Sequence, residues 1–326
     1  MGGLSYDRDV YSSGSNYSSS GFHSSSLADH AFKTSDVRAL DPKLLPLNRH
    51  LECTTKNAIV IALDVTGSMG DSAKLLYDKL PMLWGQLEQQ GYLKDFSISF
   101  AAVGDCTCDG APFQVCDFAE GKTIDDWIEK LYLEGGGGGQ ACESYEMLAH
   151  FYEKNARFTH PKAKESKPFF FIIGDEAPYP NVDADNASRN FGGHMQSDIP
   201  TKKVFEQVRD KYAFKHIHVP YKDSDVDAQV ESEWKRSIGD DFIRVKEPKA
   251  VVDVILGVVA ITSGARTLEQ YQQDMRDRGQ TETRIKNVTA ALKGIVPEVK
   301  KKSKASNTQS KKSQGTKKGR GKGQRL

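Results

Sequence analysis

The chain of 326 residues has few cysteines and no long apolar runs, and each shortage excludes a class of protein. Five cysteines without regular spacing argue against a disulfide framework and predict reduced thiols, as in a cytoplasmic protein. No segment approaches the roughly 18 apolar residues of a membrane-spanning helix, so we expect no membrane contact. Residues 1–26 lack an apolar stretch behind a basic one, so no signal peptide is predicted.

Acidic residues are absent from residues 300–326, where 11 lysines and arginines gather. The formal net charge of +1 therefore hides an acidic body, because residues 1–299 hold 34 basic and 44 acidic residues. A basic tail without aromatic residues suits contacts with phosphates, so weak binding of nucleic acid or another polyanion through residues 297–326 is one interpretation. A solubilising tail, or one that folds back on the acidic body, is an equal alternative.

Composition divides the chain into four parts. Residues 1–36 are rich in Ser, Gly and Tyr, and they are predicted to be disordered because they cannot bury enough apolar surface. Residues 40–265 alternate between strand and helix patterns and form the predicted domain. Residues 266–296 predict a polar helical extension, with helical spacing over 267–292. The basic segment 297–326 is again predicted to be disordered.

Two continuous apolar runs, residues 58–63 and 169–173, are typical of strands buried on both faces. Further strands are predicted at residues 96–103, 113–118, 216–219 and 242–245. Helices are predicted at residues 72–90, 124–133, 144–155, 204–212, 228–238 and 250–263. This alternation predicts an α/β fold with a doubly wound, mostly parallel sheet and helices on both faces.

Oxygen-bearing side chains follow both fully apolar strands. Asp64, Thr66 and Ser68 alternate directly after the first, and Asp175 comes after the second. Because ligands of an open α/β sheet bind at the carboxyl ends of its strands, we expect these groups to meet. A few carboxylates, two hydroxyls and room for water suit a hard octahedral cation, chiefly Mg²⁺ or Mn²⁺.

The segment Asp-Val-Thr-Gly-Ser-Met, from Asp64 to Met69, resembles the Asp-x-Ser/Thr-x-Ser signature of von Willebrand factor type A (VWA) domains. In that family the signature opens the metal-ion-dependent adhesion site (MIDAS). The similarity extends over about residues 55–265, and the sequence around the glycine loop resembles that of a bacterial, intracellular branch of the family. The resemblance implies a Rossmann-like fold with metal ligands at Asp64, Thr66, Ser68 and Asp175.

The glycine loop departs from the family pattern. VWA domains commonly carry a Thr after this loop as a further ligand, but residues 135–146 contain none. Either Glu143 or Ser144 is therefore expected to substitute, or that ligand is missing. The five glycines are not followed by Lys-Ser/Thr and no strand directly precedes them, which argues against a phosphate-binding P-loop.

The resemblance implies a metal-dependent protein-binding module, in which an acidic side chain of a partner completes the metal shell. Intracellular members of the superfamily often act as adaptors or assembly factors with AAA+ ATPases, so such an ATPase is a candidate partner. One alternative is a polyanion binder that works through the basic tail. Another is a Mg²⁺-dependent phosphohydrolase with Asp64 as nucleophile, but that chemistry needs a second aspartate where Thr66 stands. We therefore expect no enzymatic activity.

Two other clusters are interpreted as structural. The three cysteines between residues 106 and 116 have no obvious fourth nitrogen or sulfur ligand for zinc, so packing is the preferred interpretation. The three aspartates of residues 223–227 alternate like calcium ligands but lack the glycine and closing glutamate of a calcium loop, which favours a solvated acidic loop. His216 and His218 alternate on a predicted strand, and one of them is expected to pack inside.

Overall fold

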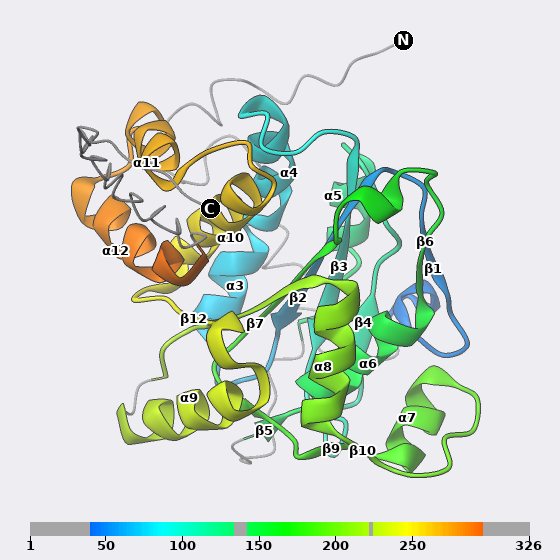
Figure 1. Cartoon of the computed structure of the whole chain (residues 1–326). Helices are drawn as coiled ribbons and strands as arrows, with labels where there is room; N and C mark the ends of the chain where they lie inside the picture. The colour runs from blue at the N-terminus through cyan, green and yellow to red at the C-terminus, as the bar shows by residue number, and fades with distance from the viewer. Residues whose placement is uncertain (1–39, 134–141, 222–223, 296–326) are drawn as a thin grey trace, which may run out of the picture. The chain divides into compact units, whose positions relative to one another are not determined.

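A six-stranded sheet forms the centre of the computed structural model, which describes residues 40–133, 142–221 and 224–295 (Figure 1). The strand order is β12-β11-β7-β2-β3-β4, and every pair is parallel except β3 with β4. The strands are β2 (Asn57–Asp64), β3 (Phe96–Val103), β4 (Phe113–Val115), β7 (Phe169–Gly174), β11 (Ala213–His218) and β12 (Phe242–Arg244). The predicted mostly parallel sheet is confirmed.

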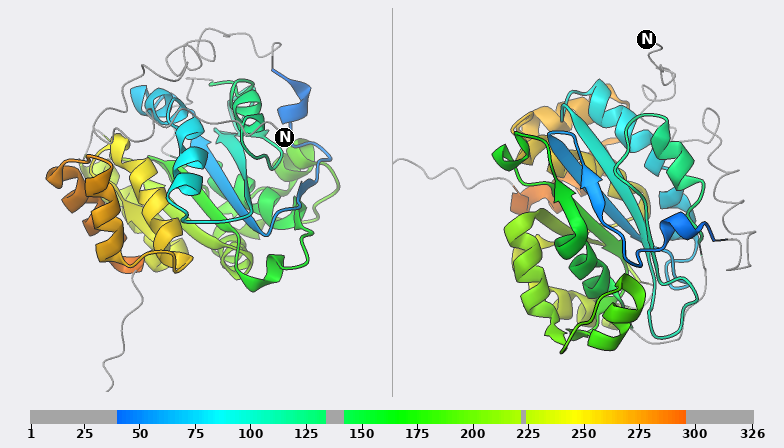
Figure 2. Two further views of the ribbon diagram at one scale, coloured as in Figure 1. Left: turned by 90° about the horizontal axis from the view of Figure 1, so that it is seen from above. Right: turned by 90° about the vertical axis from the view of Figure 1, so that its right-hand side faces the viewer.

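Helices cover both faces of this sheet (Figure 2). One face carries α3 (Asp71–Tyr77), α4 (Leu80–Gln89), α5 (Thr123–Ile128), α10 (Val251–Thr262), α11 (Leu268–Asp277) and α12 (Glu282–Leu292). The other carries α6 (Tyr145–Asn155), α7 (Ala184–Phe191), α8 (Thr201–Lys211) and α9 (Ser224–Ile238). Because strand side chains alternate, β2 sends Ile59 and Ile61 into the first core and Val60 and Ala62 into the second. The doubly wound architecture is confirmed.

Short two-residue and three-residue strands complete the rim of the domain. They pair β1 (Leu51–Cys53) with β6 (Ala156–Phe158), β5 (Cys142–Glu143) with β8 (Ala177–Pro178), and β9 (Asn181–Val182) with β10 (Ile199–Pro200). The β5–β8 pair sets Glu143 beside the segment that follows β7. Single 3₁₀ turns occur at η2 (Pro42–Leu44), η3 (Ala163–Glu165), η4 (Gly239–Asp241), η5 (Pro248–Ala250) and η6 (Lys293–Ile295).

Two predicted helices are each divided in the structure. The helix expected over residues 72–90 is α3 followed by α4, with Pro81 in the first turn of α4. Proline has no N–H and clashes with the preceding turn, so it opens a helix instead of continuing one. The segment 267–292 forms α11 and α12, separated at Gly279, whose φ is 73°. Helix α7 was not predicted.

The helices after residue 266 pack against α10 and share its core, to which they contribute Tyr271, Met275, Ile285, Val288 and Leu292. Wholly buried Asp253 of α10 faces Nη2 of Arg278 at 3.6 Å and Nη1 of Arg284 at 3.3 Å. These buried ion pairs link the polar helical extension to α10.

Some predictions concern residues outside the described part of the chain: the disordered ends 1–36 and 297–326, the five glycines of residues 135–139, and Asp223. The prediction of a solvated acidic loop is wrong for Asp227. Asp227 lies in α9, is 3% exposed, and accepts hydrogen bonds from His218 and Arg244. Among the described helices, none has both the length and the apolar character needed to cross a membrane.

Candidate metal centre

The candidate site lies where the order of the strands reverses. In chain order, the strands from β4 across to β12 read 3-2-1-4-5-6, so β2 and β7 are neighbours that lead to opposite halves of the sheet. Ligands of open α/β sheets bind outside the carboxyl ends of the strands at this switch point. Asp64 is the last residue of β2, and Asp175 directly follows β7.

Hydrogen bonds join the four residues that the sequence predicted as ligands. The Thr66 amide and hydroxyl both donate to Oδ1 of Asp64, at 2.9 and 2.6 Å. The Thr66 and Ser68 hydroxyl oxygens are 3.1 Å apart, and Ser68 donates to Oδ1 of Asp175 at 3.0 Å. Asp64, Thr66 and Asp175 are buried, and Ser68 is half-buried. The fold thus brings a local turn together with a residue 107 positions further along the chain.

The distances between these oxygens are those of ordinary O–H···O hydrogen bonds, and they are also compatible with an octahedral cation. Ligands about 2.0–2.1 Å from Mg²⁺ place neighbouring oxygens of an octahedron roughly 2.9 Å apart. The three successive oxygen–oxygen distances here are 2.6, 3.1 and 3.0 Å. Within residues 40–133, 142–221 and 224–295, no three His, Cys, Asp or Glu side chains are grouped so as to hold a metal. The candidate shell therefore comprises two carboxylates and two hydroxyls, with its other positions left to water or a partner.

The structure separates the two candidates for the further ligand. The Ser144 hydroxyl is wholly buried and accepts from the Cys106 amide at 3.0 Å. Glu143 is 3% exposed, and its Oε2 has no hydrogen-bond partner among the described residues. Glu143 is therefore the stronger candidate, although it does not join Asp64 and Asp175 in a three-carboxylate group.

Glu176 is a site residue that the sequence prediction did not include. The Ser68 side chain hydrogen-bonds to it, and its Oε2 is buried without a hydrogen-bond partner in the described structure. The Nε1 of Trp234 donates to the Glu176 carbonyl at 2.8 Å, which fixes the backbone here. The available signal was the Asp-Glu pair directly after an apolar strand.

The carboxyl groups of this site have raised pKa values. Burial raises the pKa of Asp64 to about 6. Burial, followed by the negative charge of Asp64, raises the pKa of Glu176 to about 7, of Asp175 to about 8 and of Glu143 to about 10. For these groups burial and neighbouring acidic charges outweigh the hydrogen bonds that lower the pKa values, which is the electrostatic setting that a divalent cation would relieve.

The Tyr145 side chain orients the Asp64 carboxyl group. Its hydroxyl donates to Oδ2 of Asp64, and its ring packs against Trp234 at a centroid distance of 5.5 Å. A Cβ atom on Gly174 would lie 2.1 Å from the tyrosine oxygen, so only glycine leaves room for this contact. With the two donors of Thr66, the Asp64 carboxyl group is fixed by three hydrogen bonds. Neither Tyr145 nor Gly174 could be assigned this role without the tertiary structure.

A second Asp-x-Thr turn follows β3, the next strand in the sheet. The Thr107 amide and hydroxyl both donate to Oδ1 of Asp105 at 2.8 Å, as Thr66 does to Asp64. At the fifth position, however, Asp109 stands where the first turn has Ser68, and its Oδ2 accepts from the Asp105 amide at 2.7 Å. The local turn is repeated, but in this copy the remaining oxygen of Asp105 accepts from the Tyr179 hydroxyl at 2.9 Å, and no hydroxyl of this turn bonds to Asp175 in the described part of the chain.

Comparison with known proteins identifies no family: no family model matches the chain, and no curated protein does. One crystal structure of the pilus adhesin SpaC from Lactobacillus rhamnosus GG is similar, with 9% sequence identity and a TM-score of 0.44. The match covers 66% of this chain and 32% of the adhesin chain. The open conformation of SpaC has 10% sequence identity and a TM-score of 0.44, and the match covers 71% of this chain and 31% of the adhesin chain. Proximal thread matrix protein 1 from the mussel byssus has 9% sequence identity and a TM-score of 0.41, and the match covers 65% of this chain and 49% of the matrix protein chain. The chain thus spans about a third of the adhesin and half of the matrix protein.

Proposed function

We propose that the chain is a metal-dependent protein-binding module of the VWA type, with Mg²⁺ or Mn²⁺ held by Asp64, Thr66, Ser68 and Asp175. One observation carries the proposal. Oxygens of the four candidate ligands, from two segments distant in the sequence, are brought together in one continuous series of contacts. Their position at the switch point of the sheet, where such folds bind ligands, supports it further.

Each residue has a distinct part in this function. Asp64 and Asp175 supply negative charge, while Thr66 and Ser68 contribute neutral oxygens. Tyr145 keeps the Asp64 carboxyl group in one orientation. A bound cation with so few charged ligands supplies an electrophilic position for a carboxylate. The partner is therefore expected to present an acidic side chain, and its binding should depend on the metal.

The surroundings of Asp64 favour binding over hydrolysis. Both oxygens of Asp64 accept hydrogen bonds that hold the carboxyl group in one orientation, as expected of a fixed binding residue. Thr66 also occupies the position where phosphatases of this motif need a second aspartate. These features support a binding module without catalytic activity, and the resemblance to VWA domains suggests an adaptor or assembly factor in an intracellular complex. An AAA+ ATPase is the candidate partner.

The metal can be tested with a control inside the same motif. Isothermal titration with MgCl₂ or MnCl₂ should show binding to the full chain. Asp64→Ala should weaken it by at least about tenfold, as expected when a metal site loses a ligand or its support. Asp105→Ala alters the matching turn after β3 and should change the affinity far less. Thermal unfolding of each variant separates loss of the site from loss of the fold.

A pull-down in Mg²⁺ and in chelator, with mass spectrometry of the captured proteins, tests the partner. Capture that is unchanged by both chelator and Asp64→Ala would refute the proposal. Deleting residues 297–326 distinguishes the alternative, a polyanion binder, because only that function predicts loss of a salt-sensitive affinity with the tail.

A further inference from the structure

A cavity of about 710 Å³ opens at the opposite edge of the sheet, where β2, β7 and β11 begin. Its volume lies within the range of roughly 300–1,000 Å³ that is usual for small-molecule sites. Four segments distant in sequence line it together with Ala213, and their lining residues are Lys56–Asn57, Gly91–Lys94, Glu165–Lys167 with Phe169, and Thr262–Ala265.

The lining combines an apolar part with a cationic rim. Tyr92, Leu93 and Phe169 belong to the lining but are almost fully buried, so they give the cavity an apolar base and contribute little open surface. Three lysines, Lys56, Lys94 and Lys167, and one acidic residue, Glu165, belong to the lining. The charged side chains of the lining therefore sum to an excess of two positive charges.

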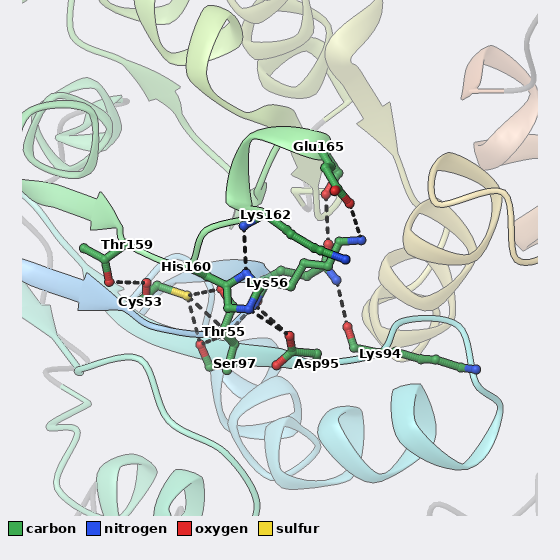
Figure 3. Close-up of polar contacts among 12 residues, drawn as sticks. Cys53, Thr55, Lys56, Lys94, Asp95, Ser97, Thr159, His160, Lys162 and Glu165 are labelled. Carbon is green, nitrogen blue, oxygen red and sulfur yellow. Dashed lines mark hydrogen bonds and ion pairs between the residues drawn. The ribbon is translucent and has the colours of Figure 1, made fainter.

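The three ammonium groups differ in their partners. Lys56 forms an ion pair with Glu165 at 2.7 Å, and Lys167 donates to the carbonyl of Arg209 at 2.6 Å. Lys94 forms no ion pair with any described residue. Figure 3 shows its side chain extending away from Glu165. Two lysines of the rim thus have no carboxylate partner of their own in the described structure.

The rim is held in place without the lysine side chains. Asn57 donates to the carbonyl of Lys94 at 2.7 Å and accepts from the Ser166 hydroxyl at 2.9 Å, while the Lys56 amide donates to Asp95 at 3.2 Å. These bonds tie the loop before β3 and the segment before β7 to the first residues of β2, and Figure 3 labels Lys56, Lys94 and Asp95 among the residues involved. The cavity is therefore preformed, which lowers the entropy cost of binding.

We propose that this cavity binds a small organic anion, a phosphate or carboxylate group carried on an apolar ring. A neutral ligand would leave the excess positive charge unmatched, and an inorganic anion would leave the apolar part of the lining uncovered. Lysine offers a compact charge with three donors, which suits a phosphate group. The site is independent of the proposed metal centre, because the two lie at opposite edges of the sheet.

Phenyl phosphate and AMP are suitable probes, with phenol, adenosine and inorganic phosphate as their separate halves. Titration calorimetry on the full chain should show each whole probe binding at least about tenfold more tightly than either of its halves. Lys94→Gln should weaken binding by about tenfold, because it removes a charge-assisted contact. The matched control is Lys162→Gln, an exposed lysine of the same edge that does not line the cavity, and it should have little effect.

Asp64→Ala should leave this affinity unchanged, so failure of the metal proposal does not affect the result. No binding of either probe at roughly 10 mM would overturn the proposal. Binding that Lys94→Gln and Lys162→Gln weaken equally would also overturn it, since that result indicates general attraction to surface lysines.

Discussion

The two edges of the central sheet differ in both charge and burial. At the carboxyl edge, acidic and hydroxyl groups are enclosed: Asp64 is wholly buried, and Asp175 is 2% exposed. At the amino edge, the ion pair of Lys56 and Glu165 has side-chain exposures of 34% and 54%. Enclosed polar groups interact at low effective dielectric, while exposed charges are screened by water and salt. Substitutions at the carboxyl edge should therefore have much larger effects than those at the amino edge.

Gly174→Ala should have the largest effect. The added methyl group would overlap the Tyr145 hydroxyl, so either the strand end or the tyrosine must shift. Overpacking of this kind costs about 1–3 kcal/mol of unfolding free energy, measured by urea denaturation. Gly294→Ala is the control, because a Cβ atom there meets nothing within 4 Å. Equal stability of the two variants would contradict the tight packing under Asp64.

Tyr145→Phe tests the support of the metal centre. Loss of a buried hydrogen bond should cost about 1–2 kcal/mol, and loss of the contact that orients Asp64 should weaken Mg²⁺ binding by roughly tenfold. Tyr152→Phe is a matched control on the same helix, since its buried hydroxyl lies 2.8 Å from that of Ser99, away from the site. Both variants should lose stability, but only the first should lose metal affinity. If Tyr152→Phe lost metal affinity to the same extent, Tyr145 would act on the metal through stability alone.

His216→Phe should make the protein more resistant to acid. Both His216 and His218 are wholly buried, and neither ring nitrogen of His216 has a hydrogen-bond partner among the described residues. The His216 ring stacks on Trp234 at 3.8 Å, and Tyr145, His218 and Phe242 also face it. Burial, then the neighbouring His218, lowers the pKa of His216 well below 6.5. Phenylalanine fits the same stacked position and cannot be protonated.

The sign follows from this lowered pKa. Above about pH 6.5 both the folded and unfolded chains carry neutral His216, and below it the unfolded chain gains a proton that the folded chain does not. The wild type should therefore lose about 1 kcal/mol through His216 between about pH 7.5 and pH 5.5, and His216→Phe should not. Unfolding curves at both pH values measure the difference, with His50→Phe at an exposed site as control. Identical pH dependence of wild type and His216→Phe would show that His216 accepts protons in the folded state.

Lys56→Ala should have the smallest effect. A part-exposed ion pair contributes about 0–1 kcal/mol, and that contribution should disappear in roughly 1 M NaCl. Urea denaturation at low and high salt measures it. A cost of 2 kcal/mol or more, unchanged by salt, would show that the amino edge is as tightly coupled to the fold as the carboxyl edge.

Much of the architecture could be predicted because burial leaves a regular pattern in the sequence. The runs at residues 58–63 and 169–173 became the two central strands. Pro81 could have indicated the division between α3 and α4. The leucine spacing continues through the proline, however, and it predicted one continuous helix. Helix α7 is polar on much of its surface and gave a weak apolar signal. Its position depends on Phe191, which packs on Phe113 and Phe151 from distant segments.

The sequence by itself determined the turn in which Thr66 bonds to Asp64, because donor and acceptor are two residues apart and a strand end suffices to form it. The turn at Asp105 forms the same Asp–Thr hydrogen bonds, yet within the described residues none of its hydroxyls bonds to Asp175. Tertiary structure decided which copy reaches Asp175, which glycine makes room for Tyr145, and where the lysines of the amino edge gather around a cavity. The physical reason is that these contacts depend on strand order and register, which arise only when distant segments compete for the same buried space.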